Sequence, residues 1–114
     1  MDKSTHKRII EFVRAVASQN AGYVTSYLFG SYANKTNHAD SDIDIALVFD
    51  PLKDSEKFDL QVLLILQASR FDNRIEPHPI SKEDIRGNSP FALQILKTGV
   101  EISIGKKNGA IPVS

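Results

Sequence analysis

Two aspartates open an apolar segment of the chain, at a spacing that places both carboxylates together. Asp42 and Asp44 begin the stretch DIDIALVF, whose composition predicts a β-strand over residues 42–49. Because side chains two residues apart share a face of a strand, the carboxylates are expected to project together, opposite Ile43, Ile45 and Leu47. Paired carboxylates repel each other unless a proton or cation lies between them, and oxygen ligands suit Mg²⁺. The alternative is that Asp42 caps a turn and Asp44 is a solvated strand residue.

A glycine and a serine come before these aspartates, directly after a second predicted strand over residues 23–29. Gly30 has no Cβ and therefore lets the backbone approach a ligand closely. Ser31 opens the next turn and offers a hydroxyl and backbone N–H groups to a phosphate. The polar residues 31–41 are expected to form a loop. A strand, a Gly-Ser turn, a polar loop and a strand opening with two aspartates together indicate nucleotide and metal binding.

The stretch LFGSYA…DSDIDIALV resembles the signature of the DNA polymerase β-type nucleotidyltransferase superfamily. Ten residues, 32–41, separate the Gly-Ser pair from Asp42, which is the spacing of the minimal nucleotidyltransferase branch. The resemblance extends over roughly residues 5–104. It implies an α/β (α+β) fold, in which a small mixed β-sheet is flanked by helices.

The resemblance also implies the roles of the site residues. Gly30 and Ser31 would hold the nucleotide phosphates, while Asp42 and Asp44 would bind divalent metal. Glu76, in the segment RIEPHPIS, is the candidate for the third carboxylate, where many relatives carry Asp. These three acids are thus the expected catalytic residues and ligands of two Mg²⁺ ions, with ATP as the substrate.

The loop between the two strands departs from the family pattern. Relatives often carry a basic residue and a glycine where this chain has Asn34 and Lys35. The departure concerns the loop conformation more than the metal site. Tyr32 and Lys35 are candidates for contact with the base or phosphate, and a solvated loop explains them equally well.

The three histidines carry a weaker signal. His78 lies two residues after Glu76 and is expected to support the site or the fold rather than to act directly. His6 and His38 are expected to be solvent-exposed.

The implied partner is a HEPN-type toxin. Minimal domains of this branch commonly act beside such an all-helical protein, so the resemblance implies an antitoxin that binds the toxin, attaches AMP to its tyrosine, or does both. One alternative is a binding module that inhibits a partner sterically without turnover. Another is a stand-alone transferase that modifies a small molecule.

Composition limits the other possibilities. The chain has 114 residues, with Lys plus Arg and Asp plus Glu equal at 14 each, which argues against a general nucleic-acid binder. It contains no cysteine, which excludes a thiolate metal site. We find neither a signal peptide nor an apolar run that would span a bilayer, and therefore expect a cytoplasmic protein. Residues 1–104 are expected to form one domain and residues 105–114 a flexible tail.

The remaining elements follow from periodicity and turn signals. Residues 4–17 predict a helix capped by Ser4 or Thr5. Residues 54–70 predict a helix whose wide apolar arc is either enclosed by the domain or meets a partner. Residues 74–81 predict a strand, and Pro77 and Pro79 favour an edge position or a strand ending there. A capped short helix after Ser81, a helix from residue 89 to a stop at Gly99 and a strand over residues 100–105 complete the chain.

Overall fold

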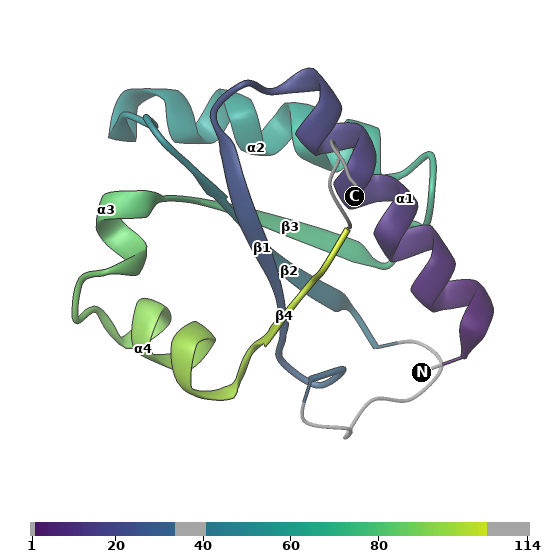
Figure 1. Ribbon diagram of the computed structural model, residues 1–114. Helices are drawn as coiled ribbons and strands as arrows, with labels where there is room; N and C mark the ends of the chain where they lie inside the picture. The colour runs from purple at the N-terminus through teal and green to yellow at the C-terminus, as the bar shows by residue number, and fades with distance from the viewer. Residues whose placement is uncertain (1, 34–40, 105–114) are drawn as a thin grey trace.

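The computed structural model describes residues 2–33 and 41–104. A mixed four-stranded sheet lies between helices, as the sequence predicts (Figure 1). The described elements, in chain order, are α1 (Lys3–Gln19), β1 (Tyr23–Phe29), β2 (Ile43–Phe49), α2 (Asp54–Ala68), β3 (Ile75–Ser81), α3 (Lys82–Ile85), α4 (Pro90–Thr98) and β4 (Val100–Glu101).

The strand order is β3-β2-β1-β4, with β1 antiparallel to β2 and β4, and β2 parallel to β3. β3 is therefore an edge strand, which confirms the prediction from Pro77 and Pro79. An edge strand tolerates proline because one side of it forms no ladder. The register pairs Asp44 of β2 with Phe29 of β1 on one side and with Glu76 of β3 on the other.

Both faces of β2 are buried. Ile43, Ile45 and Leu47 pack in one core with α1 and α2, as predicted. Ala46 and Val48 lie on the other face, in a second core with α3 and α4. Figure 1 shows α1 and α2 together on one side of the molecule and α3 and α4 on the other. Asp44 lies on the same face of β2 as Ala46 and Val48, at the end of this second core.

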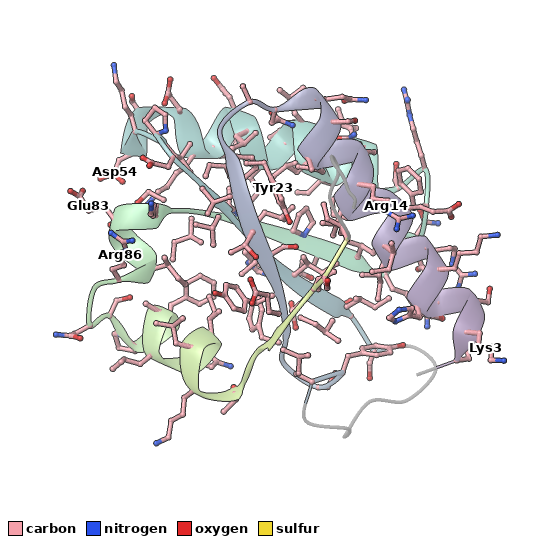
Figure 2. All side chains as sticks on the ribbon, viewed as in Figure 1. Lys3, Arg14, Tyr23, Asp54, Glu83 and Arg86 are labelled. Carbon is pink, nitrogen blue, oxygen red and sulfur yellow. The ribbon has the colours of Figure 1, made fainter. Side chains whose placement is uncertain are left out.

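The helix α1 begins earlier than the sequence indicates. The predicted caps, Ser4 and Thr5, are wrong: Asp2 is the N-cap, and its carboxylate accepts a hydrogen bond from the Thr5 backbone N–H. The predicted stripe is confirmed, since all four of its apolar residues are buried (Ile9, Phe12, Val13 and Val16). Figure 2 shows Lys3 projecting away from the sheet at the start of this helix.

The helix α2 is not enclosed by the domain, so the first interpretation of its apolar arc is wrong. Leu64 and Ala68 face the core, and Leu60 packs partly against it. Other residues of the apolar arc lie on the outer side of the helix, because the sheet and α1 cover only one face of it. We call these exposed residues the outer α2 face: Phe58, Val62, Leu63, Ile65 and Leu66.

The C-terminal elements follow the predicted caps closely. Ser81 and Ser89 cap α3 and α4 through their side chains, and Gly99 ends α4. The last strand is shorter than expected, since it pairs with β1 over two residues only. The predicted tail lies outside the described residues. Across the described part of the chain, no helix is long and apolar enough to cross a membrane.

Candidate active site

The turn after β1 brings the backbone against Asp44. Gly30 has a φ of +75°, a conformation that residues with a Cβ rarely adopt. A Cβ built on Gly30 would lie 2.5 Å from Oδ2 of Asp44. Glycine is therefore favoured twice, by the backbone conformation and by the close approach of the neighbouring carboxylate. Ser31 follows in the turn and is half-buried.

Three carboxylates gather beside this turn. Asp44 and Glu76 are neighbours in the parallel pair of strands β2 and β3, and Asp42 lies exposed just before β2. Burial and the charges of Asp42 and Asp44 raise the pKa of Glu76 above its ordinary value, and a hydrogen bond with Asp42 adds to the effect. The structure thus brings together the acids singled out in the sequence, although they come from different strands.

His78 joins this group. Its Nε2 lies 3.2 Å from Oδ1 of Asp44 and 3.8 Å from Oε1 of Glu76. One potential ligand atom from each of these three side chains lies within 4.8 Å of the others. The position of His78 two residues after Glu76, on the same face of β3, was the only local signal for this contact.

Tyr32 does not face the carboxylates. Its ring is buried in the core beneath α1 and α2, which contradicts the suggestion that it contacts a base or phosphate. The guanidinium of Arg74 donates a 2.9 Å hydrogen bond to its hydroxyl. Lys35, Asn34 and His38 lie outside the described residues.

The hydrogen bond between Arg74 and Tyr32 is part of an ion-pair network that the sequence did not suggest. Arg74 and Arg8 both bind the carboxylate of Asp72, at 2.7 and 3.1 Å, and Arg74 also reaches the hydroxyl of Thr5. Hydrogen bonds from Arg74 hold the pKa of Asp72 well below its usual range, against the effect of burial. The network ties the start of β3 to α1 and, through Tyr32, to the turn after Gly30.

The donor set fits a divalent cation. Carboxylate oxygens are the ligands that Mg²⁺ prefers, and it is commonly held by one or two carboxylates together with substrate phosphates. Burial is the main cause of the raised pKa of Glu76, and the negative charges of Asp42 and Asp44 add to it. A cation at this position would relieve the repulsion.

Comparison with known proteins agrees with this geometry. The family model described as "Polymerase beta, Nucleotidyltransferase" matches residues 11–108, and the chain belongs to this nucleotidyltransferase family. Among curated proteins, none matches the chain.

Several solved structures share the fold. A putative nucleotidyltransferase from Sulfolobus solfataricus is 26% identical with a TM-score of 0.62, and the match covers 96% of this chain and 94% of that one. A chain of a toxin–antitoxin complex with AMP-PNP is 28% identical with a TM-score of 0.55, covering 84% and 70%. A chain of the tri-AMPylated Shewanella oneidensis HEPN toxin complex with MNT antitoxin, at 22% identity and a TM-score of 0.52, covers 89% and 71% and shows likeness of fold.

Proposed function

We propose that this protein transfers AMP from ATP to a hydroxyl group in a reaction that depends on Mg²⁺. The observation that carries the proposal is the pair of carboxylates of Asp44 and Glu76 beside the turn at Gly30, together with Asp42, which interacts with Glu76. Membership of the nucleotidyltransferase family supports the reaction class. The solved toxin–antitoxin complex with AMP-PNP supports an adenine nucleotide.

Each residue has a role that its chemistry suits. The backbone N–H groups at Gly30 and Ser31 would bind the triphosphate, and the three carboxylates would hold two Mg²⁺ ions. When bound, these ions neutralise phosphate charge and lower the pKa of the attacking hydroxyl. The hydroxyl oxygen bonds to the α-phosphorus while the bond to pyrophosphate breaks. Glu76 is the group proposed to accept the hydroxyl proton.

The proposed acceptor is a tyrosine of a HEPN-type toxin, which makes the protein an antitoxin. Support comes from the 28% identical chain, which was solved in a toxin–antitoxin complex. The outer α2 face supplies an apolar docking surface, since Phe58 and Leu63 are 74% and 63% exposed. Exposed apolar clusters of this kind typically mark protein–protein contact sites.

The transfer is tested by incubating the protein with its HEPN partner, ATP and Mg²⁺ and measuring the mass of the partner. We expect the mass to increase by one or more AMP groups. Asp44→Asn is expected to abolish the increase without unfolding the protein. Asp54→Asn is the matched control, because this carboxylate is 92% exposed at the start of α2 and forms its ion pair with Lys57, away from the cluster. Full transfer by an Asp42→Asn, Asp44→Asn double variant would refute the proposal.

The docking surface is tested separately by pull-down of the HEPN partner. Leu63→Glu places a charge in the outer α2 face and is expected to abolish binding. Leu93→Glu changes another exposed leucine, on α4 across the sheet, and is expected to leave binding unchanged. Equal binding by both variants would place the interface elsewhere.

Two alternatives remain distinguishable by experiment. A purely steric inhibitor would bind its partner but show no binding of ATP with Mg²⁺ in a calorimetric titration. A transferase for small molecules would consume ATP with a low-molecular-weight hydroxyl acceptor and leave the HEPN partner unmodified. The carboxylate cluster favours a transferase over a purely steric inhibitor, because an inhibitor that acts only as a scaffold has no need of mutually repelling acids.

A further inference from the structure

His78 occupies a defined position between the two strand carboxylates. It lies beside Ala46 in the parallel register of β2 and β3, and the small side chain of Ala46 leaves room for the imidazole. From there Nε2 reaches Asp44 at 3.2 Å and approaches Glu76 at 3.8 Å.

Two aromatic rings fix the orientation of the imidazole. Phe29 of β1 packs against it edge to face, with ring centroids 5.3 Å apart, and Phe91 of α4 lies at 5.9 Å. The two phenylalanines also contact each other at 5.5 Å. The imidazole is therefore held by its own strand, by β1 and by α4, so that Nε2 stays directed at the carboxylates.

The 3.2 Å contact joins Nε2 of His78 to Oδ1 of Asp44, and its direction depends on the tautomer of the imidazole. An ionised carboxylate only accepts hydrogen bonds, so with Asp44 ionised, as cation binding requires, Nε2 is the donor. A nitrogen that carries a proton has no lone pair free for a metal. On the other side of Asp44, Oδ2 packs over Gly30, where no Cβ intervenes. One oxygen of this carboxylate is thus hydrogen-bonded to His78, and the other lies beside the turn.

We propose that His78 is a positioning residue, which fixes the carboxylate of Asp44 for cation binding without coordinating the cation itself. The inference rests on the proposed function, since it requires that Asp44 and Glu76 bind a divalent cation. Second-sphere partners of this kind orient metal-binding side chains, and their loss typically weakens metal binding by about 10- to 100-fold.

The test is a titration of the protein with Mn²⁺, followed by the electron paramagnetic resonance signal of the free ion. His78→Phe keeps an aromatic ring between Phe29 and Phe91 but removes the donor, and we expect Mn²⁺ affinity to fall about 10- to 100-fold. His78→Gln restores an N–H group and is expected to recover most of the affinity. His6→Phe, on the exposed surface of α1, is the control and should bind Mn²⁺ like the unaltered protein. The melting temperature of each variant checks the fold.

Pulsed resonance of bound Mn²⁺ separates positioning from coordination. We expect no coupling to a directly bound nitrogen in the unaltered protein. Such a coupling, or unchanged affinity in His78→Phe, overturns the inference while leaving the proposed metal site intact. Failure of the unaltered protein to bind Mn²⁺ at all, or binding that Asp44→Asn does not weaken, would overturn the proposed function itself.

Discussion

Replacing Gly30 with alanine tests the link between the turn and the carboxylates. The new Cβ would lie 2.5 Å from Oδ2 of Asp44, whereas ordinary van der Waals contact begins at 3.4 Å, so the oxygen must retreat by about 1 Å. That oxygen is the end of a flexible side chain, and its movement costs the fold little. The displaced carboxylate loses its hydrogen bond to His78 and its place in the cluster.

The cost to stability comes mainly from the backbone. At a φ of +75°, a residue with a Cβ is about 1–2 kcal/mol less stable than glycine. For a domain of this size, that corresponds to a fall in melting temperature of about 4–10 °C. We also expect Mn²⁺ affinity to fall by about 10- to 100-fold, because the displaced carboxylate no longer holds its position for the cation. The assays are thermal unfolding and Mn²⁺ titration on the same preparation.

Gly22→Ala is the matched control. Gly22 precedes β1 at the end remote from the site, its φ is not positive, and its Cβ would meet only the backbone of Asp50 at 3.2 Å. It should leave Mn²⁺ affinity unchanged. Unchanged Mn²⁺ affinity in Gly30→Ala would refute the reasoning about the turn. A fall in melting temperature well beyond about 10 °C would show that the backbone, and not the side chain of Asp44, moves to relieve the clash.

Three further predictions concern the network and the caps. Asp72→Asn should lower the free energy of unfolding by about 2–3 kcal/mol at neutral pH. The largely buried carboxylate (8% exposed) forms ion pairs with two arginines that are themselves partly solvated, and the variant removes both pairs. Since the folded-state pKa of Asp72 is depressed well below its ordinary value of 3.8, this stabilisation is fully present above that value and is lost progressively as the pH falls from there toward the folded-state pKa. Denaturant curves of the two proteins should therefore converge only well below pH 3.8. Tyr32→Phe removes the hydroxyl that accepts a hydrogen bond from Arg74 and should lower the free energy of unfolding by about 1–2 kcal/mol in the same assay. An unchanged free energy of unfolding would show that this contact does not stabilise the fold. Ser89→Ala removes the N-cap of α4 and should cost about 1 kcal/mol, whereas unchanged stability would show that the cap is dispensable.

Much of the fold follows from local patterns. The apolar stripe of α1, the alternation in β2 and the two prolines of β3 each report on burial within one element, and the structure agrees with all three. Periodicity cannot show which side of an element meets the core when apolar residues surround it. The α2 helix is apolar over most of its circumference, so only the placement of the sheet decides that Leu64 is buried and Leu63 is exposed.

For the candidate site, too, some features follow from the sequence and others depend on the tertiary structure. The sequence by itself determined the local chemistry: two carboxylates at strand spacing, a glycine turn before them, and a third acid in a later strand. The tertiary structure alone decided that β3 pairs parallel to β2 with Glu76 beside Asp44, and that His78 comes within hydrogen-bonding distance of the same carboxylate. It also decided that Tyr32 is buried. The physical reason is that strand pairing and helix packing join residues far apart in the chain, and no local spacing specifies that register.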